Sequence, residues 1–305
     1  MGAGRNGAGL RILILGGAGM LGHKLAQEFR NRFETWVTLR GSAGAYSEHS
    51  LFDLARIIPH TDISSFDAVV RAMKTARPDA VINCIGVIKQ LPTAKDPLLS
   101  IETNALFPHR LANLCAAAAV RVIHISTDCV FSGAKGQYTE SDVADAHDLY
   151  GRTKYLGEIS GDQMLTLRTS IVGRELRTSS GLVEWFLSQR RGRVRGWTRA
   201  VYTGLTTLVL ARVIGDILER YAPLNGVYQV ASDPITKYEL LCLLGDAYGA
   251  EVEIERSDEV AIDRSLDGSR FRAATGFVAP SWLDMVGEMA ADPTPYDEWR
   301  HGHAS

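Results

Sequence analysis

The first 170 residues alternate between short apolar runs and longer amphipathic segments. Apolar runs that end in turn residues predict buried strands over 11–15, 35–39, 80–85, 121–125 and 164–168. Apolar residues at helical spacing predict helices over 20–32, 66–74, 102–119 and 150–159. In the first of these, Leu21, Leu25 and Phe29 recur every four residues and share one face. Because parallel strands need crossover helices, the alternation predicts a doubly wound parallel α/β sheet.

The regular alternation ends near residue 170. Beyond it, the pattern predicts helices over 182–189, 206–221 and 235–248, a strand over 226–231 that rejoins the sheet, and a short strand over 252–254 followed by small helices. We therefore predict two units. The sheet domain comprises 1–172 and 200–235, and a smaller C-terminal lobe comprises 173–199 and 236–305. Such a lobe packs over the strand ends, where sheets of this kind bind ligands.

The composition is that of an ordinary globular protein, with 305 residues, 46% hydrophobic residues, 22% charged residues and a formal net charge of −2. So small a net charge gives no reason to expect nucleic acid as a partner. No apolar run approaches the roughly 20 residues of a membrane-spanning helix, so no membrane partner is expected. Residues 1–9 lack the apolar core of a signal peptide and are expected to form a flexible leader.

The cysteines and histidines form no metal-binding pattern. The four cysteines show neither a CxxC pair nor the spacing of a zinc site, and the eight histidines include no HExxH motif. No metal is therefore predicted. In a chain of this size without a signal sequence, we expect reduced thiols and a cytoplasmic location.

A glycine-rich loop joins the first predicted strand to the first predicted helix, with Gly16, Gly19 and Gly22 at intervals of three. At such a junction the first glycine permits a tight turn, the second lets a pyrophosphate approach the backbone, and the third allows close packing of helix on strand. The helix N-terminus adds unpaired amide donors, here around Met20 and Leu21. The loop predicts a Rossmann dinucleotide site. The alternative is a glycine-rich turn without a ligand.

The residues after the second strand indicate which nicotinamide dinucleotide binds. An acid at this position usually bonds the ribose hydroxyls of NAD, whereas the 2′-phosphate of NADP favours a cation. The chain has Arg40-Gly41-Ser42 here. We therefore predict NADP(H), with Arg40 on the phosphate and Ser42 adding a hydroxyl, and regard NAD(H) as less favoured. The alternative is that Arg40 is an ordinary surface residue.

Two further segments at strand ends complete the predicted cofactor site. Asp62 and Ile63, in the turn before the helix at 66–74, are expected to bond and cover the adenine. The end of the strand at 80–85 is expected to let the backbone pass the ribose, through Asn83, Cys84, Ile85 and Gly86.

Tyr150 and Lys154 lie four residues apart on one predicted helix, downstream of a Ser-Thr-Asp turn that contains Thr127. A phenol with an ordinary pKa near 10 is a weak acid at neutral pH. A lysine ammonium one helical turn away stabilises the phenolate and can bond the nicotinamide ribose. We predict that Thr127 donates to a substrate carbonyl and that Tyr150 protonates its oxygen as hydride arrives. Alone, a Tyr-x-x-x-Lys pattern usually marks only an exposed helix face.

With these motifs in this order, the chain resembles the extended short-chain dehydrogenase/reductases and, within them, the dTDP-4-dehydrorhamnose reductase group of sugar-nucleotide reductases. The resemblance extends from residue 11 to about residue 280 and is strongest over Gly16–His23, Ile125–Gly133, Tyr150–Glu158 and Leu167–Ser170. It implies a catalytic trio of Thr127, Tyr150 and Lys154. It also implies that Asn104 supports the site from a helix, although a local helix cap is an alternative role for an asparagine.

The predicted substrate contacts lie around this trio and in an arginine-rich stretch over 190–199. Arginine forks suit diphosphates and an indole can stack on a base, so the stretch offers a nucleotide clamp. The alternative is a set of solvated surface charges. The candidate substrate residues are Val87, Asp128, Val130, Ser170 and Trp197.

The chain departs from the family pattern at two places. Cys129 stands where a tyrosine usually follows Ser-Thr-Asp, and Trp197–Gly204 lacks the glutamine and proline of a Gln-x-Gly-x-Pro-Thr element that contacts the substrate. The predicted reaction type is compatible with both changes, but they leave the sugar and the base open.

The sequence predicts NADPH-dependent reduction of the 4-keto group of a nucleotide-linked 6-deoxyhexose, with a nucleotide sugar as substrate. A second hypothesis is epimerisation or dehydration of a UDP-sugar on the same fold, which normally uses NAD and an acid in place of Arg40. A third is a non-catalytic nucleotide-binding regulatory subunit, which loss of Tyr150 or Lys154 would favour; both are present. Because relatives are often dimers, a homodimer is a further hypothesis.

Overall fold

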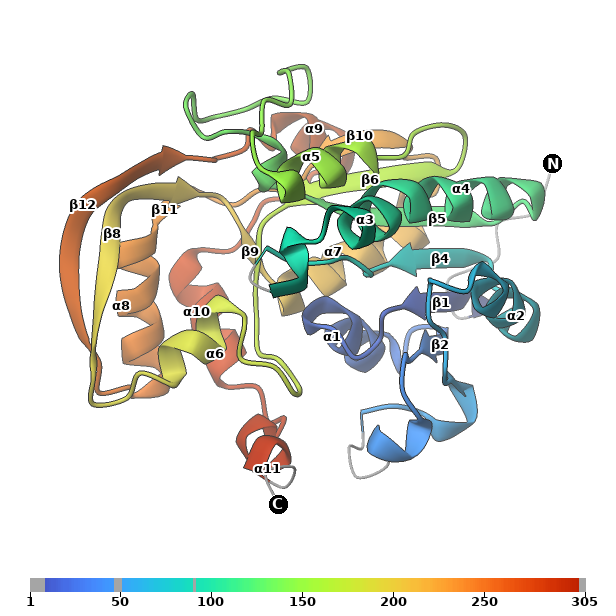
Figure 1. Ribbon diagram of the computed structural model, residues 1–305, viewed down its shortest axis with the longest axis horizontal. Coiled ribbons are helices and arrows are strands. Elements are labelled where there is room, and N and C mark those ends of the chain that lie inside the picture. The colour runs from blue at the N-terminus through green and yellow to red at the C-terminus, as the bar shows by residue number, and fades with distance from the viewer. Residues whose placement is uncertain (1–8, 47–50, 90–91, 302–305) are drawn as a thin grey trace.

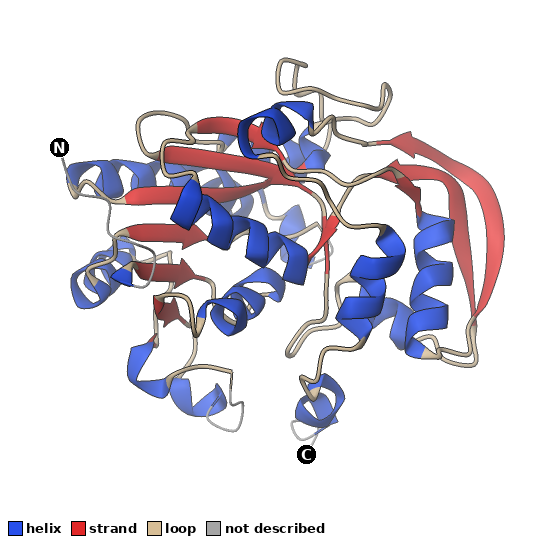
Figure 2. Cartoon of the chain, turned by 180° about the vertical axis from the view of Figure 1, so that it is seen from behind, coloured by secondary structure: helices blue, strands red, loops and turns tan. Residues whose placement is uncertain are grey.

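The computed structural model describes residues 9–46, 51–89 and 92–301 of the chain. Most of the predicted leader, residues 1–8, lies outside these ranges. Figures 1 and 2 show a large parallel sheet with helices on both sides and, next to it, a second group of strands and helices from the C-terminal half.

Seven strands form the main sheet in the order β10-β6-β5-β4-β1-β2-β3, and every neighbouring pair is parallel. Their bounds are β1 Arg11–Leu15, β2 Glu34–Thr38, β3 Ile57–Ile58, β4 Ala80–Asn83, β5 Arg121–Thr127, β6 Met164–Thr169 and β10 Gly226–Gln229. The predicted doubly wound α/β fold is confirmed, including the return of the chain to the sheet after residue 226. The sequence pattern does not predict the two-residue β3.

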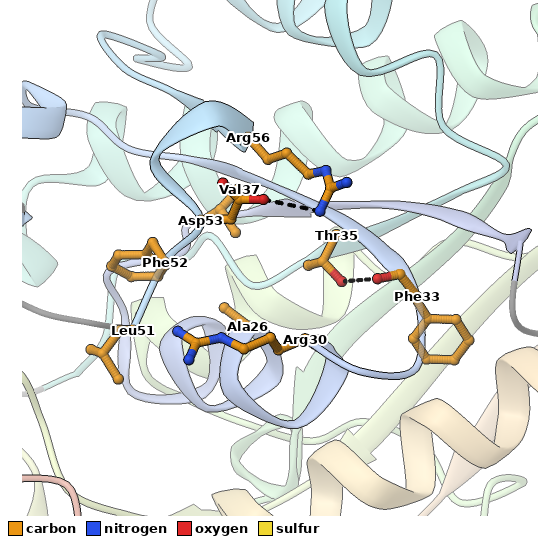
Figure 3. Close-up of a pocket in the computed structure, with 9 residues that line it drawn as sticks. All are labelled: Ala26, Arg30, Phe33, Thr35, Val37, Leu51, Phe52, Asp53 and Arg56. Atoms are coloured by element: carbon orange, nitrogen blue, oxygen red, sulfur yellow. Dashed lines mark hydrogen bonds and ion pairs between the residues drawn. The ribbon is translucent and has the colours of Figure 1, made fainter.

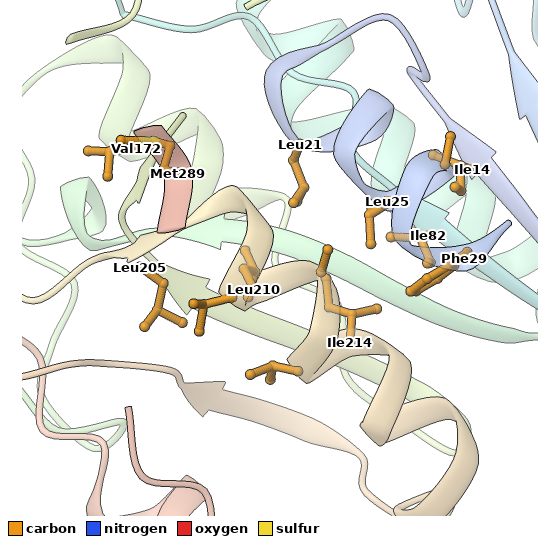
Figure 4. Close-up of a cluster of buried hydrophobic side chains, with 14 of the residues drawn as sticks. Ile14, Leu21, Leu25, Phe29, Ile82, Val172, Leu205, Leu210, Ile214 and Met289 are labelled. Atoms are coloured by element: carbon orange, nitrogen blue, oxygen red, sulfur yellow. The ribbon is translucent and has the colours of Figure 1, made fainter. Parts of the chain in front are cut away.

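Helices cover both faces of the sheet because its strands are apolar on both sides. The main ones are α1 Met20–Phe29, α2 Phe66–Ala76, α4 Phe107–Ala117 and α7 Thr207–Arg220. Along β1, the buried Ile12 and Ile14 belong to the cluster that contains α1 and α7, whereas Leu13 and Leu15 belong to the cluster with α2 and α4. In Figure 4, apolar side chains of α1 such as Leu25 face α7. This packing holds the N-terminus of α1 at the end of β1.

The helix predicted over 102–119 begins earlier and changes pitch. Helix α3 (Pro97–Ser100), the π-helical turn η5 (Ile101–Leu106) and α4 follow one another along the chain. The start is fixed by Asp96, whose side chain accepts from two backbone amides of the first turn, with a proline at the first helical position. The wider turn carries Asn104, and π turns are frequent at functional sites.

A second sheet of three strands is formed by the C-terminal half of the chain. Strand β8 (Arg193–Tyr202) lies between β11 (Ile235–Thr236) and β12 (Glu253–Asp263). The strand predicted over 252–254 is wrong in length, because β12 continues to Asp263. No helix or strand was predicted over the arginine-rich stretch at 190–199. This stretch forms most of β8. Its arginines alternate with small or apolar residues, so that one face is exposed and the other is buried.

The remaining predicted helices are present to within a few residues, as α5 Leu149–Leu156, α6 Leu182–Leu187, α8 Lys237–Tyr248 and the small helices α9 Ser269–Thr275, α10 Trp282–Ala290 and α11 Tyr296–His301. The sequence pattern does not predict the paired short strands β7 Ile171–Val172 and β9 Leu205–Thr206. Within the described ranges, no helix has the length and apolar character needed to cross a bilayer. The division into a sheet domain and a lobe stays a prediction, and β8 crosses its proposed boundary at residue 200.

The C-terminal segment packs back onto α1 through polar contacts. The ring of His23 is fully buried, and its Nδ1 donates to the Gly19 carbonyl at 2.8 Å, so its Nε2 accepts from the Tyr296 hydroxyl at 2.9 Å. Lys24 pairs with Asp292 on the same side. Burial lowers the pKa of His23 to about 4. The neutral ring therefore connects the first turn of α1 to the C-terminal segment.

Candidate active site

The glycine-rich loop has the close backbone contacts that its spacing predicts. Gly16 has a φ of +83°, which side chains rarely tolerate. A Cβ on Gly22 would lie 2.2 Å from the Gly16 carbonyl oxygen, so a glycine here is what lets α1 pack against the end of β1. The Gly19 amide donates to the same oxygen at 3.0 Å and closes the turn.

The N-terminus of α1 offers amide donors beside this turn. Gly19 is the N-cap, and no described side chain caps the helix. Amide donors and the helix dipole both favour a negative group at such an end, so the residues present fit a dinucleotide pyrophosphate. Leu21 is buried in the main core, which leaves its backbone for a ligand. The Met20 side chain lies against Gly181 at the start of α6.

Arg40 and Ser42 follow β2 and are exposed. The Ser64 amide donates to the Asp62 carboxylate at 2.9 Å and lowers the pKa of Asp62. The positive charge of Arg40 lowers the same pKa further, so Arg40 lies near Asp62. Ile63 packs on the second core cluster. The predicted phosphate and adenine residues therefore share one edge of the sheet, where Arg40 faces a carboxylate as well as solvent.

The end of β4 lies against the glycine-rich loop. The Cys84 amide donates to the carbonyl of the last residue of β1 at 3.1 Å. A Cβ on Gly16 would lie 3.0 Å from the side chain of Ile85. Asn83 is buried, donates to Nδ1 of His124 at 3.1 Å and accepts from the Ile85 amide at 3.1 Å. These contacts bring the predicted ribose residues to the side of the loop.

Lys154 extends from α5 to the ends of the strands. Its Nζ donates to the Ile125 carbonyl of β5 at 2.7 Å, and the residue is 5% exposed. Burial lowers the pKa of Lys154 to about 8, while Glu158 and Cys84 act in the opposite direction. The ammonium therefore lies near Cys84, at the strand end where the ribose is predicted to bind.

Tyr150 lies one turn before Lys154 and next to Thr127 and Cys129. Burial raises the pKa of Tyr150, and the contact with the Thr127 hydroxyl opposes the shift. The net direction is opposite to the one expected from a lysine one helical turn away, because burial disfavours the charged phenolate. A phenol that keeps its proton suits a proton donor better than a base.

The hydroxyl of Thr127, at the end of β5, is already engaged. It donates to the Asp128 carboxylate at 3.0 Å and accepts from the Cys129 amide at 3.1 Å. Burial raises the pKa of Asp128, which the bond from Thr127 opposes. Donation from Thr127 to a substrate carbonyl would therefore require its hydroxyl to turn away from Asp128.

Asn104 connects two segments of the site. Its Oδ1 accepts from the Val87 amide at 2.9 Å, and its Nδ2 donates to the Val87 carbonyl at 3.1 Å. The same Nδ2 lies 3.4 Å from Oγ1 of Thr153 on α5. A Cβ on Gly86 would lie 3.3 Å from Oδ1, so this glycine leaves room for the side chain. Asn104 thus positions the loop after β4 relative to the helix of Tyr150, and it is not a local cap.

A buried ion pair, absent from the predicted site, lies next to the trio. Glu158 and Arg168 form two hydrogen bonds of 2.8 Å, with side chains 6% and 5% exposed. Glu158 also accepts from the Ser126 hydroxyl at 2.7 Å. The pair therefore fixes the ends of β5 and β6 to the segment after α5. Both residues belong to stretches that carry the family resemblance, which was the signal available in the sequence.

Of the predicted substrate residues, Val130 is enclosed by the core and Ser170 is partly exposed. Val130 is fully buried in a small cluster with Phe131 and Leu266. Its side chain is therefore not available to a substrate, because neighbouring apolar residues enclose it. Ser170, between β6 and β7, is partly exposed and accepts from the Leu205 amide at 2.9 Å through its carbonyl, so its hydroxyl stays a candidate.

The arginine-rich stretch pairs with acids of the neighbouring strand. Arg193 lies 3.0 Å from Glu253, and Arg195 lies 2.8 Å from Glu259, all with exposed side chains. The Lys237 ammonium lies 4.3 Å from the ring centroid of Trp197. These contacts favour the alternative of solvated surface charges over a diphosphate clamp, and they give Trp197 a cation of this chain as its neighbour.

The ends of β8 and β12 bring two residues near the trio that were not among the predicted site residues. Arg264 follows β12; its Nε donates to the Phe131 carbonyl at 2.9 Å, and its charge lowers the pKa of Asp128 against the larger effect of burial. Tyr202 ends β8, and burial together with the charge of Asp128 raises its pKa. Tyr202 belongs to the stretch that departs from the family pattern, which was its signal. No motif marks Arg264.

A cavity of about 300 Å³ lies away from these residues, between α1, β2 and the segment after residue 50 (Figure 3). Apolar side chains and the charged Arg30, Asp53 and Arg56 line it, and Asp53 pairs with Arg56 at 3.0 Å. None of the predicted site residues lines it. The cavity thus belongs to the edge of the sheet and not to the candidate active site.

Known proteins of similar sequence include a reductase and a subunit of a methionine adenosyltransferase. A dTDP-4-dehydrorhamnose reductase of Mycolicibacterium smegmatis is 35% identical over 151 residues, which are 48% of this chain and 40% of that protein. The match therefore spans less than half of that reductase. The methionine adenosyltransferase 2 subunit beta of Xenopus tropicalis is 24% identical over 254 residues, which are 79% of this chain and 72% of that protein.

The fold and the family model extend over most of the chain. The crystal structure of a dTDP-4-dehydrorhamnose reductase from Bacillus anthracis in complex with NADP has a TM-score of 0.76 at 19% identity and covers 93% of this chain and 99% of that one, which shows a shared fold. A family model described as RmlD substrate binding domain matches residues 10–293. The chain therefore belongs to the RmlD substrate binding domain family.

Proposed function

We propose that this chain reduces the 4-keto group of a nucleotide-linked 6-deoxyhexose with NADPH. One observation carries the proposal: Lys154 reaches the backbone of β5 at Ile125, two residues before Thr127, while Tyr150 on the same helix lies next to Thr127. A cation, an acid and a hydroxyl thus lie together at the strand ends beside the glycine-rich loop. The dinucleotide, when bound, supplies hydride.

In this proposal Tyr150 donates its proton to the oxygen of the substrate carbonyl. Its raised pKa holds the proton until that oxygen gains negative charge. Lys154 bonds a ribose hydroxyl and stabilises the phenolate that the transfer leaves. Thr127 turns from Asp128 to donate to the same oxygen. Asn104 holds the loop after β4 and the helix of Tyr150 in register.

We propose NADP(H) as the dinucleotide. The support is the exposed guanidinium of Arg40 just beyond β2, where the chain has no acid next to the strand. The solved reductase of Bacillus anthracis also carries NADP. NAD(H) is the less favoured alternative, and it belongs with the hypothesis of a UDP-sugar epimerase or dehydratase.

A regulatory subunit is the second candidate. The match to methionine adenosyltransferase 2 subunit beta favours it, because that match covers more of this chain than the match to the reductase. The presence of both Tyr150 and Lys154, with Lys154 buried and bonded to β5, favours the enzyme. A nucleotide sugar is the proposed ligand in either case.

The test is to follow NADPH oxidation with dTDP-4-dehydrorhamnose and with a panel of other keto-sugar nucleotides. Wild type is expected to turn over at least one of them, faster with NADPH than with NADH. Tyr150→Phe is expected to lose roughly a hundredfold or more in turnover and to keep NADPH binding. Tyr155→Phe is a matched control, because Tyr155 is 45% exposed on the same helix. Full activity of Tyr150→Phe would refute the acid role, and binding without turnover by wild type would favour the regulatory subunit.

We further propose a homodimer in the cytoplasm. Large apolar side chains are exposed on α3, η5 and α5, namely Leu98, Ile101, Leu106, Tyr155 and Leu156. An exposed apolar surface of this kind is typical of a protein interface. All four cysteines are free thiols, which suits a reducing compartment. Sedimentation equilibrium tests the dimer, and a monomer at micromolar concentration would contradict it.

A further inference from the structure

Tyr202 has a buried hydroxyl without a hydrogen-bond partner among the described residues. It is the last residue of β8, where it pairs with Ile235 of β11. Its ring packs edge-on against Trp282, with the ring centroids 6.0 Å apart. Buried phenols usually find a partner, because an unpaired polar group in the interior costs free energy. An unpaired hydroxyl next to a candidate active site points to a ligand that completes it.

The position of Tyr202 is fixed relative to the catalytic loop. The backbone amide of Arg264 donates to the carbonyl of Val201, the neighbour of Tyr202, at 2.9 Å. The guanidinium Nε of the same arginine donates to the Phe131 carbonyl at 2.9 Å. Arg264 therefore holds the end of β8 against the loop that begins at Thr127. The Tyr202 phenol lies near enough to Asp128 for the carboxylate charge to act on it.

A donor and an acceptor thus lie near each other, and within the described residues the Tyr202 hydroxyl bonds neither Asp128 nor any other group. The phenol of Tyr202 can donate, and the carboxylate of Asp128, which accepts from Thr127, has capacity for a further donor. A ligand hydroxyl both accepts and donates, so it satisfies both groups. A carbonyl oxygen, which only accepts, would leave the carboxylate without this further donor.

We infer that Tyr202 is a substrate-specificity residue, which donates to one ring hydroxyl of the sugar while that hydroxyl donates to Asp128. The inference rests on the proposed function, since it names a contact of the same site. It assigns the end of β8, in the three-stranded sheet, a direct role in recognising the sugar, separate from the trio at the ends of the main sheet and on α5.

The variant Tyr202→Phe removes the hydroxyl and keeps the ring against Trp282. Because the hydroxyl has no partner within the described chain, the thermal midpoint of the ligand-free variant should equal or exceed that of wild type. Tyr248→Phe is the matched control: its hydroxyl donates to the Met289 carbonyl at 3.3 Å, so the loss should lower the midpoint. A drop for Tyr202→Phe as large as that of the control would overturn the inference, because it would reveal a bond within the chain.

Binding is then measured by calorimetry with NADP+ present, using dTDP and dTDP-rhamnose, the alcohol product of the proposed reaction. Wild type is expected to bind dTDP-rhamnose more tightly than dTDP. Tyr202→Phe should lose roughly threefold to thirtyfold in affinity for dTDP-rhamnose and keep its affinity for dTDP. In turnover, KM for the keto sugar should rise by a similar factor while kcat changes little.

The outcomes separate the inference from the function on which it rests. If wild type binds dTDP-rhamnose and Tyr202→Phe binds it equally well, the inference alone is overturned. If wild type binds dTDP-rhamnose no better than dTDP and reduces no keto-sugar nucleotide, the proposed function fails and the inference fails with it. An equal loss of affinity for dTDP and for dTDP-rhamnose would place Tyr202 at the nucleotide and also overturn the sugar assignment.

Discussion

The carboxamide of Asn104 bonds both the amide and the carbonyl of Val87, 17 residues away in the sequence. It supplies the two hydrogen bonds that a neighbouring strand would otherwise give to Val87. The same carboxamide reaches Thr153 on the helix of Tyr150 and Lys154. One buried side chain therefore couples the loop predicted to bind the cofactor to the helix predicted to perform the chemistry.

Asn104→Ala should weaken both stability and turnover. The change leaves the amide and carbonyl of Val87 without their partner, which costs about 1–3 kcal/mol in the free energy of unfolding. Because the helix of Tyr150 loses its register with the loop, turnover should fall roughly tenfold to a hundredfold. Urea unfolding and steady-state kinetics measure the two effects. Asn113→Ala, at an exposed position of α4, is the control and should change stability by less than about 0.5 kcal/mol. Unchanged turnover in Asn104→Ala would contradict the positioning role.

The rate should fall as pH rises through about 8. Burial lowers the pKa of Lys154 to about 8, so the ammonium loses its proton above that pH and with it the charge that stabilises the Tyr150 phenolate. A pH profile of kcat should therefore bend downward near pH 8. Lys154→Arg should be slower but should lack this bend, because a guanidinium stays protonated over the whole range. A wild-type profile that is flat to pH 10 would show that the ammonium is not required.

The sequence predicts those parts of the site whose residues are close together in the chain, and it does not predict residues that only the tertiary fold brings together. The glycine spacing and the Tyr-x-x-x-Lys pair are local, and both occupy the strand-to-helix junction and the helix that they predict. Asn104 entered only through the family resemblance, since its partner Val87 is distant in sequence. Arg264 carries no motif, and Tyr202 was marked only by the stretch that departs from the family pattern, because the tertiary packing of β8 and β12 brings both residues toward Asp128.

Acid should destabilise the protein through His23. The folded pKa of about 4 lies below the ordinary value of 6.5, so the unfolded chain binds more protons between these pH values. The stabilising contribution is present above pH 6.5 and is lost as pH falls toward 4, by about 3 kcal/mol at most. Urea unfolding at several pH values should show this loss in wild type and a smaller one in His23→Gln.

The control for this prediction is His109→Gln, because His109 is exposed. That variant should retain the acid sensitivity of wild type. An unaltered pH dependence in His23→Gln would show that other groups cause the loss of stability in acid, and that the link from His23 to Tyr296 contributes little.

Arg40→Ala should reduce the preference for NADPH over NADH. A bond from a guanidinium to a phosphate contributes about 1.5–3 kcal/mol, so KM for NADPH should rise roughly tenfold to a hundredfold while KM for NADH stays constant. Arg71→Ala, at an exposed position of α2, should change neither value. If wild type prefers NADH and Arg40→Ala does not change that preference, Arg40 does not bind the 2′-phosphate. That result would favour the hypotheses that use NAD.

The fold was predictable where the hydrophobic pattern is strong, and the lobe was not. Strands buried on both faces give continuous apolar runs, and all of those predicted in the main sheet are present. Strand β12 has mostly polar and charged residues, so its length is set by pairing with β8 and not by its own composition. Burial, which no motif encodes, raises the pKa of Tyr150, whereas the lysine one turn away led to the opposite expectation.

The central claim is that the phenol of Tyr150, the ammonium of Lys154 and the hydroxyl of Thr127 converge on the reactive face of a bound nicotinamide. A crystal structure of the protein with NADP+ tests it most directly. We expect the nicotinamide ring to lie over the end of β5, with the Lys154 ammonium at hydrogen-bond distance from its ribose and the Tyr150 phenol facing the ring. A ring bound elsewhere, or a phenol that points away from it into solvent, would contradict the assignment of this site.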